Sequence, residues 1–84
     1  MKLSKTQSTV IKLMREGWEM GRSTSFNDNR IWLQKNGIGR GGETFEVRFN
    51  TYSALGNREL IKLKEQRFPT SLYELTEIGK MVTL

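Results

Sequence analysis

The segment LQKNGIGRGGETFEV, Leu33 to Val47, holds four of the chain's eight glycines. Gly37, Gly39 and Gly42 stand at the G-x-G-x-x-G spacing that binds a dinucleotide's pyrophosphate when a strand precedes the loop and a helix follows it. Here the following residues, ETFEVRF, alternate polar and apolar side chains and predict a strand. The segment therefore favours a β-hairpin with a long glycine-rich turn, several of whose residues adopt positive φ, over a dinucleotide site.

Both flanks of this turn predict strands. Residues 30–35, RIWLQK, are rich in side chains that favour strands. From Thr44 to Phe49, the apolar Phe45, Val47 and Phe49 share one face, and the polar residues between them share the other. We expect the two strands to pair as the arms of the hairpin.

Trp32 raises a separate question about the first arm. Ile31 and Leu33 flank it, so one face of this strand leaves an apolar side chain exposed or covered by a neighbour. An exposed Trp32, or a hairpin strand at the edge of a sheet, would indicate a protein interface or a homodimer.

A first helix is predicted upstream, over Lys5–Glu16. Ser4 and Gln7 fit a capping box, and Gly17 provides the stop. Apolar residues recur at helical spacing in this segment, at Val10, Ile11 and Met14. Farther on, GRSTSFNDN, residues 21–29, predicts a loop.

A second helix is predicted after the hairpin, in TYSALGNRELIKLKEQ, residues 51–66, with Asn50 or Thr51 as its cap. It either runs the length of this segment or ends near Arg58, in which case LIKLK begins a strand. Its buried side would comprise Ala54, Leu55, Arg58 and Ile61.

The C-terminal quarter contains one break and two short elements. Phe68-Pro69 interrupts regular structure. Leu72–Leu75 predicts a strand, and Thr76 begins a final helical turn.

Length and composition narrow the possible functions. Residues 1–84 predict one domain with its own core, and no apolar run is long enough to span a bilayer or resembles a secretory signal. The cytoplasm is therefore the expected location. The net charge of +5 favours an anionic partner, nucleic acid first.

The chain has no cysteine and no histidine. These absences argue against disulfides, most zinc sites and the common nucleophile–histidine pairs of hydrolases. The carboxylates are scattered along the sequence, and no nucleophile has an evident base. We expect no enzyme activity, no metal and no cofactor.

Three segments resemble winged-helix DNA-binding domains. YELTEIGK, Tyr73 to Lys80, is similar to the Y-x-L-T-x-x-G ending of many such domains, in which a wing strand precedes a threonine-capped helix. LSKTQSTVIKLMREG, residues 3–17, resembles their opening helix. TYSALGNRELI resembles their recognition-helix segment, T-x-x-A-L-x-x-R-G-L-I, with matching residues at Thr51, Ala54, Leu55, Arg58, Leu60 and Ile61.

This resemblance implies an α+β, winged-helix-like domain, of a kind encoded on phages and mobile elements and used in transcription regulation. Glu59 stands where the family pattern has a helix-ending glycine. Residues 18–49 predict strands where the first helix of the helix-turn-helix would lie. We therefore expect a β-hairpin to replace that helix.

The second helix is then the main candidate for contacting double-stranded DNA. Asparagine and arginine bond base edges, whereas lysine, serine and tyrosine suit phosphates. On this basis Arg58→Ala should weaken sequence preference. The predicted DNA-binding residues are Tyr52, Ser53, Asn57, Arg58, Lys62, Lys64, Arg40 and Lys5.

Three alternatives stay open. The glycine-rich loop, with Arg40 at its tip and Lys35 nearby, could clamp a phosphate backbone. The same scaffold could instead serve as a protein-interaction module, or a homodimer, that uses the hairpin and Trp32 and binds no DNA. The chain's aromatic side chains also suit stacking on single-stranded nucleic acid.

Overall fold

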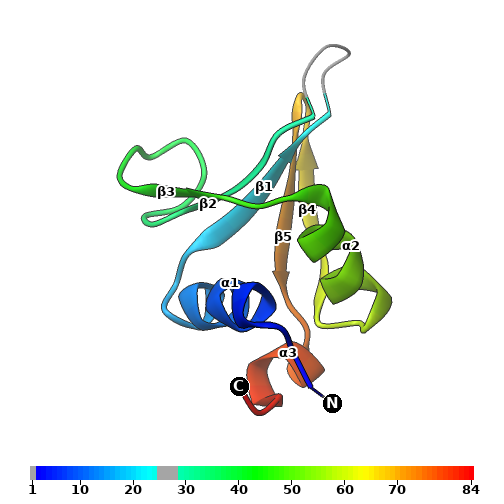
Figure 1. The fold of residues 1–84 in the computed structure, drawn as a ribbon. Coiled ribbons are helices and arrows are strands. Elements are labelled where there is room, and N and C mark those ends of the chain that lie inside the picture. The colour runs from blue at the N-terminus through cyan, green and yellow to red at the C-terminus, as the bar shows by residue number, and fades with distance from the viewer. Residues whose placement is uncertain (1, 25–28) are drawn as a thin grey trace.

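The computed structural model describes residues 2–24 and 29–84. Within these ranges it is a small α+β structure with three helices and a five-stranded antiparallel sheet (Figure 1). None of these helices is long and apolar enough to cross a membrane. In chain order the elements are α1 (Lys5–Arg15), β1 (Glu19–Ser23), β2 (Ile31–Gln34), β3 (Thr44–Glu46), α2 (Phe49–Asn57), β4 (Ile61–Arg67), β5 (Thr70–Leu75) and α3 (Glu77–Met81).

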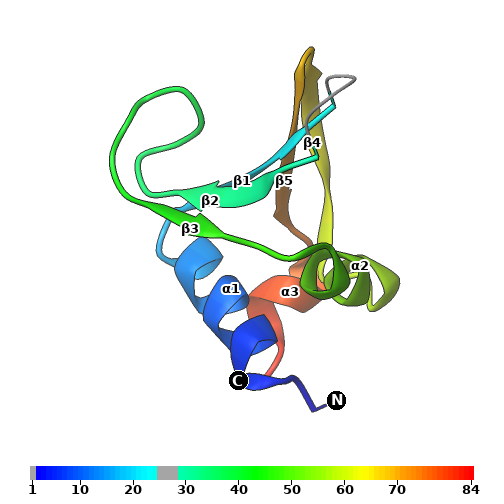
Figure 2. The ribbon, with the colours of Figure 1, turned by 45° about the horizontal axis from the view of Figure 1, so that its top comes forward.

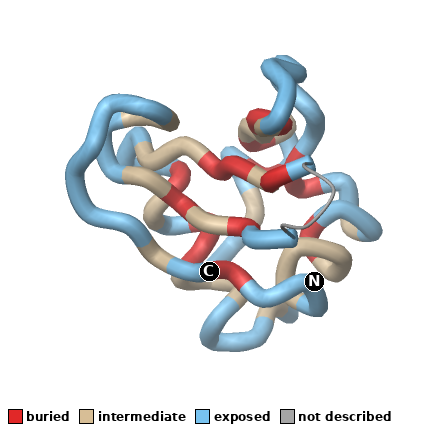
Figure 3. The backbone as a smooth tube through the Cα atoms, turned by 90° about the horizontal axis from the view of Figure 1, so that it is seen from above, coloured by how far each residue is buried: buried red, intermediate tan, exposed pale blue. Residues whose placement is uncertain are grey.

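The sheet has the strand order β3-β2-β1-β5-β4, with antiparallel neighbours throughout. Figure 2 shows the helices gathered on one side of this sheet. The buried stretches of the chain run through the middle of the arrangement (Figure 3). The apolar core between helices and sheet comprises Val10, Ile11, Met14, Met20, Ile31, Leu33, Val47, Leu55, Leu60, Ile61 and Leu75.

α1 confirms the first predicted helix. The Ser4 side chain accepts a hydrogen bond from the Gln7 amide at 3.1 Å, and the Gln7 side chain accepts one from the Ser4 amide at 3.2 Å. The helix ends before Gly17, which adopts a φ of +103°. The capping box and the glycine stop therefore act as the sequence indicates.

β2 and β3 form the predicted hairpin, with Leu33 opposite Phe45. All four glycines in its turn have positive φ. The expected strand to Phe49 is too long, because β3 ends at Glu46 and the chain turns into α2. Phe49 belongs to the first turn of that helix, where it is 58% exposed, and does not share a strand face with Phe45.

The predicted caps of α2 are wrong: Arg48 is the N-cap, in an extended conformation, and makes no side-chain capping bond. The shorter of the two predicted helices is confirmed, because α2 ends at Asn57 and LIKLK leads into β4. Glu59 stops the helix with a φ of +57°. This left-handed residue stands where the winged-helix pattern has glycine. The Leu60 amide then donates to the Leu55 carbonyl at 3.0 Å.

β4 and β5 form a second hairpin, whose turn contains the predicted break at Phe68-Pro69. β5 begins two residues before the predicted strand. The predicted cap at Thr76 is confirmed, because its side chain accepts a hydrogen bond from the Gly79 amide at 3.0 Å. Arg15 donates to the carbonyls of Gly79 and Val82, which joins α1 to the C-terminal segment.

The predicted loop over residues 21–29 is wrong in its first part, because Gly21–Ser23 belong to β1; residues 25–28 lie outside the described residues. Gly21 marks a close contact in the sheet and not a turn. It lies opposite Trp32 on β2, and a Cβ at this position would come within 2.9 Å of Ile38 Cδ1.

Candidate nucleic-acid interface and the open face of the hairpin

The predicted DNA-binding residues do not form a single surface. Arg40 is exposed in the loop between β2 and β3, and Lys64 on β4 pairs with Glu19, which also bonds that loop through the Ile38 amide. Lys62 is exposed near the start of β4. Lys5 is the exposed first residue of α1. Asn57 is exposed at the C-terminal end of α2.

Arg58 is engaged within the protein. Its guanidinium donates to Gln7 Oε1 at 2.8 Å and to the Lys2 carbonyl at 3.3 Å. These bonds join the C-terminal end of α2 to the N-terminal end of α1. The half-buried Arg58 therefore connects two helices in the folded chain.

Tyr52 faces inward, contrary to the outward position expected on the second helix, and Ser53 is half-buried. The Tyr52 hydroxyl accepts a hydrogen bond from Arg22 Nη1 at 3.2 Å and donates to the Tyr73 hydroxyl at 2.9 Å. The two tyrosine rings meet edge to face at 5.3 Å. Burial, together with the Tyr52 hydrogen bond, raises the pKa of Tyr73.

Arg22 is the functional candidate that the sequence did not indicate. Its guanidinium carbon lies 5.1 Å from the Tyr52 ring centroid and 5.8 Å from the Phe49 ring centroid. The hydrogen bond to Tyr52 raises the pKa of Arg22, against the opposing effect of burial, so the side chain stays charged. Within the described part of the chain, Arg22 forms no salt bridge with a carboxylate.

A second cation, Arg48, is the N-cap of α2 and directly precedes Phe49, whose ring Arg22 approaches. Arg48 is exposed, and among the residues that the structure describes it also has no carboxylate partner. Asn50, two residues further along the chain, is exposed in the first turn of the helix. We call Arg22, Arg48, Phe49 and Asn50 the α2 N-terminal surface. It combines two unneutralised arginines with an amide side chain that can donate and accept hydrogen bonds.

Local sequence signals could not have identified this surface. Arg22 lies in a segment that predicts a loop, and its aromatic partners come about 30 residues later in the chain. In the sequence, Arg48 continues the alternation of polar and apolar residues over Thr44–Phe49, which predicts a position on the polar face of a strand. One feature indicates a cationic surface here: Arg48 directly precedes α2, and the first turn of α2 contains no acidic residue.

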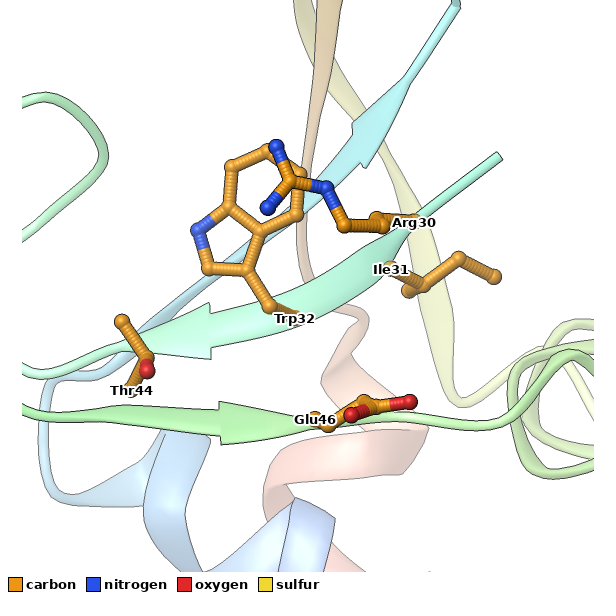
Figure 4. A pocket seen from close by; sticks show the side chains of 5 residues that line it. All are labelled: Arg30, Ile31, Trp32, Thr44 and Glu46. Carbon is orange, nitrogen blue, oxygen red and sulfur yellow. The ribbon is translucent and has the colours of Figure 1, made fainter. Parts of the chain in front are cut away.

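The face of the β2–β3 hairpin that carries Trp32 contains a hollow of about 390 Å³ beside this side chain. Figure 4 shows the Arg30 guanidinium over the indole ring, with Thr44 and Glu46 on the neighbouring strand. The guanidinium carbon lies 5.9 Å from the ring centroid. Trp32 is half-buried and also donates to Gln34 at 3.2 Å. Arg30 thus covers part of the Trp32 ring, whose exposure the sequence leaves open.

The glycine-rich loop folds back onto this same face. The side chain of Ile38 reaches Gly21, and its amide donates to Glu19 Oε1 at 3.1 Å. Gln34 donates to the Gly41 carbonyl at 3.0 Å. The loop is therefore attached at its middle and at its base, with Arg40 exposed between these contacts.

Glu19 also forms a salt bridge with Lys64 at 3.2 Å. Burial raises the pKa of Glu19, but the Ile38 amide and Lys64 lower it by more, so its pKa lies below the ordinary range. Lys64, a predicted DNA contact, is thus already paired, and exposed pairs of this kind contribute little to stability.

In the part of the chain that the structure describes, no group of acidic side chains could hold a metal ion. The geometry defines a small α+β protein with an antiparallel sheet. The chain matches no protein-family profile, no curated protein and no solved structure.

Proposed function

We propose that the protein binds double-stranded DNA through the α2 N-terminal surface and acts as a small transcriptional regulator, such as those of phages and mobile elements. The observation that carries this proposal is the pair Arg22 and Arg48. Both are cations without a carboxylate partner among the described residues, and Tyr52 and Phe49 hold Arg22 beside the first turn of α2.

The topology supports a winged-helix-like interpretation. α1 leads into β1, which pairs with β5, and β5 pairs with β4. α2 comes directly before the β4–β5 hairpin, in the position of a recognition helix before its wing. The β2–β3 hairpin occupies the chain position of the missing helix. The proposed domain is therefore a winged helix in which two strands replace one helix.

The arrangement of side chains suits duplex contact at the first turn of α2. Recognition helices present their N-terminal residues to base edges. Asn50 is exposed there and can bond adenine, whereas Arg22 and Arg48 suit the flanking phosphates. The predicted Tyr52 contact becomes a positioning role, because its hydroxyl holds Arg22.

The test is fluorescence anisotropy with a labelled duplex of about 20 base pairs, titrated from about 50 to 200 mM salt. Binding should fall steeply with added salt. Arg48→Gln should weaken it and reduce the slope of log K against log salt by about 0.9, the value of one phosphate contact. Arg22→Gln should do the same. No duplex binding at about 50 mM salt would overturn the proposal.

Lys12→Gln is the matched control. It removes one exposed cation from the last turn of α1, a different element from α2 (Figure 1). Equal losses for Lys12→Gln and Arg48→Gln would mean that only net charge matters, and would contradict binding through α2.

A further inference from the structure

β3 has one side of its backbone unpaired. It is the last strand of the sheet, and among the described residues only β2 pairs with it. The Lys35 amide donates to the Glu43 carbonyl, and the Val47 amide donates to the Ile31 carbonyl. These hydrogen bonds lie on either side of the pair Leu33–Phe45. Because alternate residues of an antiparallel strand direct their N–H and C=O groups to opposite sides, those of Thr44 and Glu46 point away from β2.

The two edges of the sheet differ in how they are protected. β4, the other edge, carries Lys62, Lys64 and Arg67 and has an irregular register between Leu63 and Glu65. Lysines and bulges are features that prevent an edge strand from pairing with another chain. β3 has a regular register with β2 and contains neither lysine nor proline. β3 therefore lacks the lysines and the irregular register that β4 has.

The side chains of β3 give this edge a defined chemistry. Thr44 and Glu46 are exposed on the face that carries Trp32, and they line the hollow beside it. Phe45 lies on the other face, half-buried against the core. A strand added to β3 would therefore place one residue opposite a carboxylate, the next opposite an aromatic ring, and the third opposite a hydroxyl.

We propose that β3 is a docking edge for an extended segment of a partner protein, which pairs antiparallel with Thr44–Glu46. Charge and polarity define the segment: a basic residue opposite Glu46, an apolar residue opposite Phe45, and a β-branched or hydroxyl residue opposite Thr44. A second copy of this chain fits less well. Two-fold pairing about Phe45 places Thr44 opposite Glu46 and brings no cation to the carboxylate.

The probe is a capped hexapeptide, VKVTVK, added to the isotopically labelled protein and followed by NMR. Its second and fourth residues would exchange main-chain hydrogen bonds with Glu46 and Thr44. Peptide binding should slow hydrogen exchange of the Thr44 and Glu46 amides by about tenfold at saturation, because hydrogen-bonded amides exchange only on opening. The same peptide N-methylated at both residues lacks these donors and should not bind.

Charge reversal tests the selectivity. Glu46→Lys should weaken binding of VKVTVK and favour VEVTVE, whereas Glu16→Lys, the same change at the exposed end of α1, should alter neither. The proposal would be overturned if the N-methylated peptide bound as tightly as VKVTVK. It would also be overturned if the peptide slowed hydrogen exchange of β4 amides instead of those of β3. Absence of binding at millimolar peptide would have the same consequence. Protection that grows with protein concentration alone would assign the edge to a second copy instead.

Discussion

The carbonyl oxygen of Leu60 lies 2.1 Å from the position that a Cβ atom on Gly79 would occupy. The same oxygen accepts a hydrogen bond from the Thr76 amide at 3.0 Å, and the Thr76 hydroxyl accepts one from the Gly79 amide. The T-x-x-G pattern at the end of the chain therefore has a local physical cause. Threonine begins α3, and glycine lets that helix approach the start of β4.

Gly79→Ala should destabilise the protein by about 2–3 kcal/mol, because overpacking against rigid backbone forces the two segments apart. Chemical denaturation followed by circular dichroism measures the change. Gly56→Ala is the matched control, since a Cβ at this helical position meets no atom within 4 Å. It should stabilise by roughly 0.5–1 kcal/mol. Similar stabilities for the two variants would contradict the proposed contact.

Glu59 stops α2 in a conformation that glycine adopts more readily, with a φ of +57°. Its exposed side chain forms no salt bridge among the described residues. Glu59→Gly should therefore raise the free energy of unfolding by about 0.5–1 kcal/mol. Glu59→Ala keeps the Cβ and should give no such gain. Thermal unfolding of both variants separates backbone strain from loss of charge.

The elements that the sequence predicted correctly depend on local signals. The capping box at Ser4, the glycine-rich turn and the cap at Thr76 each act within a few residues. The errors have non-local causes. Gly21 reads as a loop residue, but it lies in β1, where the side chains of Ile38 and Trp32 occupy the space that a Cβ atom would need.

In the candidate site, too, local signals and tertiary contacts lead to different assignments. The motif predicts that Arg58 faces DNA, but Gln7 and the Lys2 carbonyl bind its guanidinium. Arg22 had no local signal, and its position depends on Tyr52. A sequence pattern indicates which residues lie on a helix. Tertiary contacts decide which of them remain available to a ligand.

The attachment of the glycine-rich loop should depend on pH through Glu19. Its pKa is lowered in the folded protein, so the contribution to stability is complete above about pH 4.3, the ordinary glutamate value, and is lost as pH falls through the folded pKa. The chemical shift of the Ile38 amide should follow this titration, because that amide donates to the carboxylate.

Glu19→Gln should abolish the acid titration of the Ile38 amide. Glu77→Gln, on α3, serves as its control and should leave the titration unchanged. An Ile38 amide that titrates identically in the wild type and in Glu19→Gln would contradict the attachment of the loop through Glu19.

Arg58→Ala distinguishes the motif-based role of this residue from its contacts. If Arg58 read bases, the variant would lose preference among duplex sequences, as the recognition-helix resemblance implies. The structure predicts a different outcome, because the guanidinium joins α2 to α1 through Gln7 and the Lys2 carbonyl. Stability should fall by about 1 kcal/mol, a charged hydrogen bond discounted for partial exposure. The salt slope of duplex binding should stay unchanged. Gln7→Ala should cost more, because it also removes the capping bond to the Ser4 amide. A double-mutant cycle should still show that the two losses are not additive.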